Sequence, residues 1–132
     1  MENEILQPAD WAKPRGYANA IAGRGRMVFI SGQVGWDAQC RFTSRTLPGQ
    51  ALQVFRNIAT LLAEGGAEPR HLVRLTWYVT DIQAYREQAK EIGAAYREVF
   101  GKNFPTMALV QVTSLVEPDA LLEIEATALV PD

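Results

Sequence analysis

One extended segment between two amphipathic helical segments limits the possible folds of this chain more than any other feature. Residues 72 to 80 read LVRLTWYVT and alternate between two sets of side chains, as a half-buried strand does. Residues 51 to 62 and residues 82 to 99 carry apolar side chains at spacings of three and four, which predicts helices with one buried face. We therefore expect an α+β protein in which two helices cover one face of a mixed β-sheet.

Residues at the predicted helix ends support these boundaries. Gly65 and Gly66 follow the first helix, and glycine readily takes the left-handed conformation that ends many helices. Thr80 and Gln83 have the spacing of a capping box, which predicts that the second helix begins there. Gly101 stands just past the last apolar residue of the second helix and predicts its end.

The remaining segments predict four more strands. Residues 17–23 and 27–33 flank a turn-like GRGR sequence, so they are expected to form a hairpin, with Gly32 at the strand end or at a bulge. Residues 106–112 and 121–130 are expected to close the chain as two strands, which gives the order ββαβαββ. Residues 1–15 show no sustained period and are expected to be a surface arm.

Size and charge exclude several classes of protein. The 132 residues are expected to form one domain, and the net charge of −2 gives no electrostatic footprint for nucleic acid. Cys40 is the single cysteine and His71 the single histidine, which excludes an internal disulfide and leaves too few ligands for a structural zinc site. No stretch approaches the roughly 20 apolar residues of a membrane span. A cytoplasmic location, without membrane contact, is the expectation.

Four stretches in the same order as in a known family carry a resemblance. GYANAI, VFISGQ, LVRLTWYVTD and LLEIEATALV make residues 17–130 resemble the RidA family, also called YjgF/YER057c/UK114. The resemblance implies a chorismate-mutase-like α+β fold, assembled as a homotrimer that binds a small molecule in clefts between subunits. It also implies hydrolysis of reactive enamines and imines to a keto compound and ammonia, without a cofactor or a metal.

The resemblance also assigns site residues. Glu123 matches the glutamate that handles water, while Tyr17 and the backbone at Gly32 match residues that line the cleft. The arginine that binds the substrate carboxylate in that family is replaced by Met107, and Leu109 stands where a cysteine backbone contacts the ligand. A thioether cannot hold a carboxylate as a guanidinium does, so the substrate is expected to lack the usual short carboxylate or to carry it elsewhere.

Few residues offer a replacement for the lost polar contacts. Arg15, Arg24 and Arg26 are candidate cations, although each is more often a solvated charge near a turn. The family's asparagine on the second helix has no equivalent, and the nearest positions hold Ala89 and Gly93. The cleft floor is therefore expected to be apolar.

Other reactive or aromatic residues are expected to have structural roles. Glu125 lies two residues after Glu123 and is expected to pair with a neighbour, and Trp36 is expected to be a surface or interface anchor. His71 and Cys40 have no partner at catalytic spacing.

Two other functions are alternatives to imine hydrolysis. The same trimeric scaffold could bind a metabolite or another protein without turnover. Older labels of the family speak of an endoribonuclease, but the acidic net charge and the lack of a basic, aromatic-rich stripe argue against RNA cleavage.

Overall fold

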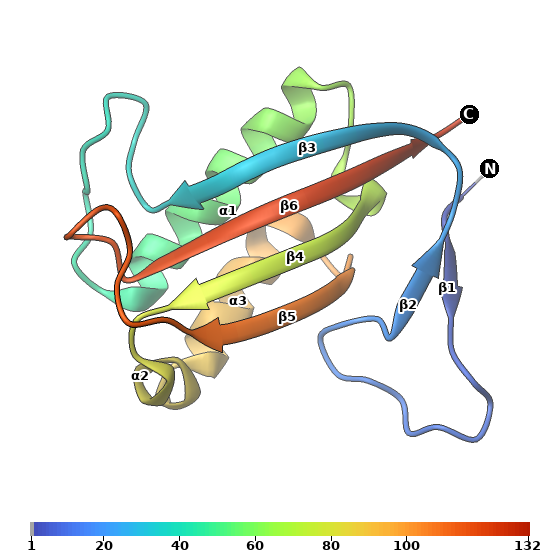
Figure 1. The fold of residues 1–132 in the computed structure, drawn as a ribbon, viewed down its shortest axis with the longest axis horizontal. Coiled ribbons are helices and arrows are strands. Elements are labelled where there is room, and N and C mark those ends of the chain that lie inside the picture. The colour runs from blue at the N-terminus through green and yellow to red at the C-terminus, as the bar shows by residue number, and fades with distance from the viewer. Residues whose placement is uncertain (1) are drawn as a thin grey trace.

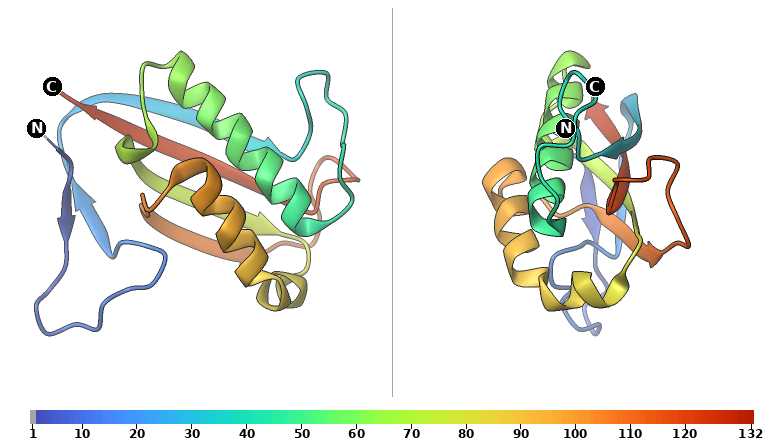
Figure 2. Two further views of the ribbon diagram at one scale, coloured as in Figure 1. Left: turned by 180° about the vertical axis from the view of Figure 1, so that it is seen from behind. Right: turned by 90° about the vertical axis from the view of Figure 1, so that its left-hand side faces the viewer.

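The computed structural model, which describes residues 2–132, contains a four-stranded mixed sheet with helices on one face (Figure 1). The elements in chain order are β1 (Glu4–Leu6), β2 (Ala20–Ala22), β3 (Gly25–Val34), α1 (Leu47–Glu64), a short 3-10 turn (Pro69–His71), β4 (Leu72–Val79), α2 (Ile82–Glu87), α3 (Ala89–Phe100), β5 (Thr106–Gln111) and β6 (Leu122–Pro131). The strand order is β3-β6-β4-β5, and both long helices lie on the same side of this sheet (Figure 2). The predicted α+β class, with two main helices on one face, is confirmed.

The core fills the space between the sheet and the two long helices. Phe55 of α1 is fully buried, and its ring makes edge-on contacts with Trp77 of β4 and Tyr96 of α3 at centroid distances of 5.5 and 5.3 Å. Apolar side chains at alternate positions of β6 and β4 face the same core, as the period of two requires. Among residues 2–132, no helix has the length and apolar content needed to cross a membrane.

Helix α1 begins before the predicted residues 51 to 62 and ends at the glycines that the sequence predicts. The Thr46 side chain accepts a hydrogen bond from the Gly49 backbone N–H at 3.1 Å, and Gly65 is the C-terminal cap. Gly66 follows with a φ of 71°, a conformation in which other residues would be strained. Arg26 Nη2 donates to the Gly65 carbonyl at 2.6 Å, so this arginine completes the helix end.

Strand β4 pairs in parallel with β5 and antiparallel with β6. Leu75, Trp77 and Val79 are buried on the helix side, as predicted. The start of the strand differs from the expected alternation: a register shift between Leu72 and Arg74 puts Leu72 in the core. Such a bulge inserts one extra residue and reverses the faces of the residues before it.

The predicted hairpin between residues 17–23 and 27–33 is wrong. Strand β2 pairs instead with β1, which lies within the expected surface arm, while β3 pairs with the distant strand β6. The two-stranded sheet of β1 and β2 stands beside the main sheet, near the chain termini (Figure 1). Met1, the first residue of that arm, lies outside the described residues.

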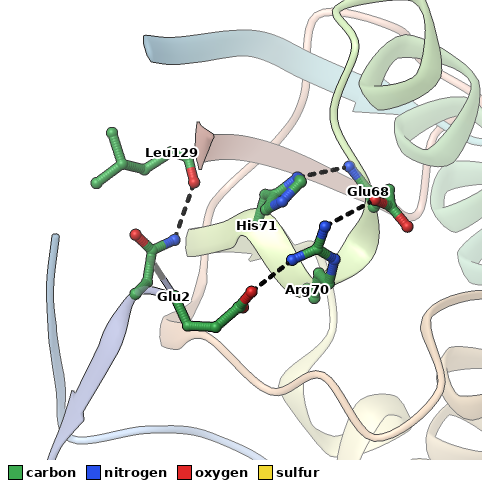
Figure 3. A network of polar contacts seen from close by, with 6 residues as sticks. Glu2, Glu68, Arg70, His71 and Leu129 are labelled. Carbon is green, nitrogen blue, oxygen red and sulfur yellow. Dashed lines mark hydrogen bonds and ion pairs between the residues drawn. The ribbon is translucent and has the colours of Figure 1, made fainter. Parts of the chain in front are cut away.

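A polar network fastens the chain start to the body of the domain (Figure 3). Arg70 Nη1 contacts the Glu2 carboxylate at 2.7 Å, and Arg70 Nη2 contacts Glu68 at 3.0 Å. His71 is buried, and its Nδ1 accepts a hydrogen bond from the Glu68 N–H at 3.0 Å. The single histidine is therefore structural.

The predicted second helix is divided at Gln88 into α2 and α3. At Gln88 the backbone has φ −111° and ψ 14°, outside the helical range, which interrupts the ladder. The predicted capping box is also wrong, because Asp81 is the cap and its side chain accepts from the Ala84 N–H at 3.0 Å. Thr80 donates to the Leu121 carbonyl instead.

One buried polar side chain fixes the start of β6. Gln50 of α1 is fully buried and donates from Nε2 to the carbonyls of Ser44 and Asp119, at 3.2 and 2.9 Å. Its Oε1 accepts from the Leu121 N–H at 2.8 Å. Both N–H donors and the oxygen of its amide have partners, so α1 holds the segment that leads into Glu123.

Candidate functional site

A cavity of about 450 Å³ opens between α3, the sheet edge at β5 and the segment before β2. Its walls are largely aromatic, formed by Trp77, Tyr85, Tyr96 and Phe104. The rings support one another: Tyr96 and Phe104 are stacked with centroids 5.3 Å apart, and Trp77 meets Tyr85 edge-on at 6.1 Å. Burial raises the pKa of Tyr96, so this phenol is neutral and acts as part of an apolar wall.

Met107 and Leu109 form part of the same cavity lining. Strand alternation turns both toward the helices, since Met107 lies opposite the buried Leu75 of β4 and Leu109 opposite the buried Trp77. Gln111 shares this face and uses its Oε1 to accept the Ile82 N–H at 2.9 Å. The side of β5 that faces the cavity is therefore apolar at residues 107 and 109.

Tyr17 reaches the cavity because the segment before β2 lies beside β5. Ala18 forms a parallel bridge with Thr106, and its N–H donates to the Pro105 carbonyl at 3.0 Å. Gly16 has a φ of 77°, which lets the chain turn between Arg15 and Tyr17 without strain. Tyr17 remains 44% exposed and lines the cavity mouth.

Two arginines line this cavity, and one was not predicted. Arg15 was a candidate from sequence, whereas Arg97 of α3 was not considered. Arg97 stands one turn beyond Gly93, and a Cβ on Gly93 would lie 3.4 Å from Arg97 Nη1, so the guanidinium lies over the glycine. Arg97 follows Ala89 and Gly93 at spacings of four, which places all three on one helix face, and this spacing is the sequence signal that points to it.

Glu123 and Gly32 lie together on the opposite, open face of the sheet. A register shift between Ile30 and Gln33 of β3 produces the bulge expected at Gly32. A Cβ added to Gly32 would lie 2.4 Å from Glu123 Oε2, so only glycine permits this approach. The Glu123 side chain has no hydrogen-bond or ion-pair partner within residues 2–132.

The neighbouring carboxylate, Glu125, is engaged in a different way. The Tyr78 hydroxyl donates to Glu125 Oε1 at 2.8 Å. This hydrogen bond is the main cause that raises the pKa of Tyr78, with partial burial and the charges of Glu125 and Glu123 adding to it. Glu125 thus has a hydrogen-bond partner, whereas Glu123 has none among the described residues 2–132.

The five predicted site residues fall into two groups in one chain. Tyr17, Met107 and Leu109 line the cavity, while Gly32 and Glu123 are in contact on the other face. One copy of the chain therefore does not bring the two groups together. Their meeting in one cleft requires a second copy and stays a prediction.

Other residues considered from sequence lie away from both groups. Trp36 packs against Phe42 with ring centroids 5.8 Å apart, and Cys40 is exposed in a turn. Arg24 lines a separate hollow at the β2–β3 turn, and Arg26 donates a hydrogen bond to the Gly65 carbonyl at the end of α1. Of the three candidate cations, only Arg15 lines the cavity that contains Met107.

Comparison with known proteins gives consistent matches over nearly the whole chain. A family model described as Endoribonuclease L-PSP matches residues 10–130. A RutC family protein of Pyrococcus abyssi is 30% identical over 97% of this chain and 98% of its own length. The human 2-iminobutanoate/2-iminopropanoate deaminase is 30% identical over 79% of this chain and 73% of its own. The crystal structure of YyfB from Yersinia pestis, described as a Rid family protein of unknown function, has a TM-score of 0.87 at 29% identity, covering 98% of this chain and 100% of that one.

Proposed function

Because this chain belongs to the RidA family, also written YjgF/YER057c/UK114, we propose that it hydrolyses a small reactive imine or enamine in a cleft between subunits of a homotrimer. The family includes a human deaminase named for 2-iminobutanoate and 2-iminopropanoate. Hydrolysis of a C=N bond by water releases a carbonyl compound and ammonia. This chemistry needs a positioned base more than it needs a cofactor.

The observation that carries the proposal is the free carboxylate of Glu123 against the backbone of Gly32. A carboxylate with no protein hydrogen-bond donor can accept a proton from a water molecule. The missing side chain at Gly32 lets this carboxylate lie directly against the backbone, since a Cβ there would be 2.4 Å from Oε2. Glu123 then orients a water toward the imine carbon and takes its proton as the C–O bond forms, and it returns this proton to the nitrogen to give the carbinolamine. The hydroxyl proton of the carbinolamine next moves to the nitrogen by way of the same carboxylate, so that the C–N bond breaks, ammonia leaves and the C=O bond forms.

Assembly brings the two groups of residues into one cleft. The open face of the sheet exposes Phe29 by 74%, Met27 by 51% and Val110 by 47%. Exposed apolar side chains on a sheet face without a helix layer are typical of an interface. Members of the family are typically trimeric, so we assign this face to contact between copies. Glu123 of one subunit then meets Tyr17 and Met107 of its neighbour.

The substrate differs from the short imino acids of the human relative. By the resemblance, Met107 stands at the position of the family's carboxylate-binding arginine, and it lines the cavity together with Leu109. The proposed site therefore favours a larger apolar group next to β5, with its charge held elsewhere.

The test is ammonia release from a panel of imines generated in situ from amino acids of increasing side-chain size. We expect the purified protein to accelerate release from at least one imine with a large apolar side chain. The panel includes the imines of alanine and 2-aminobutanoate, for which a smaller acceleration is expected. If none of the imines decays faster with the protein than without it, the hydrolase proposal is wrong.

A non-catalytic binding protein is the second candidate, and Met107 favours it because the expected substrate anchor is absent. In that case a ligand would raise the melting temperature of the protein without accelerating any imine's decay. The same imine panel separates the two candidates.

A further inference from the structure

The cavity beside Met107 combines aromatic walls with two cations at its rim. We propose that it binds an aromatic carboxylate, with the ring between the aromatic side chains and the carboxylate on Arg15 and Arg97, an inference that rests on the proposed function for its role in turnover. The charge of the ligand would then sit on α3 and the segment before β2, instead of on β5. In the family that this chain resembles, by contrast, the carboxylate is held by the arginine at the position of Met107 on β5.

Both arginines are available for a ligand. Within residues 2–132 neither Arg15 nor Arg97 takes part in an ion pair, and the cavity lining includes no Asp or Glu. Four other arginines are engaged with acidic partners, namely Arg41, Arg45, Arg56 and Arg70. Two guanidinium groups without a counterion at one cavity favour an anionic ligand, and the planar guanidinium matches the geometry of a carboxylate.

Local backbone features direct the two cations to the same cavity. Gly16, with its φ of 77°, sets the turn that separates Arg15 from Tyr17, and both side chains line the cavity. On α3, Gly93 has no side chain, and the Arg97 guanidinium lies above it. A larger side chain at residue 93 would compete with the guanidinium and with the ligand for this space.

The size and composition of the cavity favour a ring over a short aliphatic chain. A cavity of about 150 Å³ lined by apolar side chains holds a benzene molecule. The cavity here measures about 450 Å³, so a methyl or ethyl side chain would leave most of it empty. Flat aromatic walls such as Trp77 and Phe104 contact a ring over its whole face or edge, which an aliphatic chain cannot match.

Calorimetric titration with 3-phenylpropanoate, its neutral amide and pyruvate tests this inference. The amide has the same shape as the acid without its charge, and pyruvate has the carboxylate without the ring. We expect 3-phenylpropanoate to bind roughly tenfold or more tightly than either, because the amide loses hydrogen bonds between charged groups and pyruvate loses the buried ring. Binding as tight by the amide, or tighter binding of pyruvate, would overturn the inference.

Arginine variants identify the cations responsible. Arg15→Gln and Arg97→Gln are each expected to weaken 3-phenylpropanoate binding roughly tenfold, while Arg24→Gln, at an exposed turn away from the cavity, serves as the matched control and should bind as the wild type does. Unchanged binding by both cavity variants would contradict the assignment.

None of these ligands contains a C=N bond, so the result is independent of turnover. If 3-phenylpropanoate does not bind, the proposed imine hydrolysis is not contradicted. If no imine is hydrolysed, the proposed binding of an aromatic carboxylate is not contradicted.

Discussion

Glu123→Gln is expected to lower the rate of imine hydrolysis about 100-fold or more, while the protein folds and assembles as the wild type does. Glutamine keeps the shape of the side chain beside Gly32 but cannot take a proton from water. The Glu123 carboxylate has no partner within residues 2–132, so the substitution leaves no protein donor unsatisfied. The measurement is kcat/KM for ammonia release from the best substrate of the imine panel.

Glu125→Gln is the matched control for this prediction. Glu125 lies on the same strand face two residues away, but it accepts a hydrogen bond from Tyr78 at 2.8 Å. Glutamine can still accept that bond, so hydrolysis should stay within a few-fold of the wild-type rate. Equal losses in the two variants would show that the charge of the face, and not Glu123 as a base, supports the reaction.

Phe55→Ala is expected to lower the free energy of unfolding by about 4 kcal/mol, because it removes a large, fully buried ring from a packed core. The Phe55 ring meets Trp77, Tyr96 and Phe100 at centroid distances of 5.3 to 5.5 Å. Two of these rings, Trp77 and Tyr96, are walls of the ligand cavity. The loss should therefore weaken ligand binding as well as stability.

Urea unfolding at a fixed protein concentration measures this loss, since assembly makes apparent stability depend on concentration. Val116→Ala is the control, because Val116 is 91% exposed and its truncation should change stability by less than about 0.5 kcal/mol. A Phe55→Ala protein as stable as the control would mean that the aromatic cluster does not support the core.

Periodicity in the sequence predicted the elements that form the main sheet and its helical layer. The strand at 72–80 and the helix at 51–62 appear as β4 and α1, because each buries one face against the other. The pairing of the first strands was not predictable in this way. Strand β3 has a short connection to β2, yet it pairs with β6 some 100 residues later. Pairing between distant strands depends on the whole sheet, which a local pattern does not record.

The candidate site was predictable only in part for a similar reason. The resemblance singled out Tyr17, Met107 and Leu109, and all three line one cavity, while their role as a ligand site stays a prediction. Arg97 was missed because none of the four stretches that carry the resemblance contains it, although it lies one helical turn from Gly93. A bulge at Gly32 was one of two outcomes expected from the sequence, but its contact with Glu123 depends on the pairing of β3 with β6, which a local pattern does not record.

A cleft shared between subunits is tested most directly by mixing two inactive variants. Glu123→Gln removes the base from one face, and Gly93→Trp fills the cavity on the other. Suppose that each cleft is formed by the Glu123 face of one subunit and the cavity of its neighbour. When equal amounts of the two variants reassemble at random, about a quarter of the clefts then contain both an intact Glu123 and an intact cavity. We predict that the unfolded and refolded mixture regains about that fraction of wild-type ammonia release. A mixture as inactive as its two components would contradict the account, because it would mean that both halves of the site belong to a single chain.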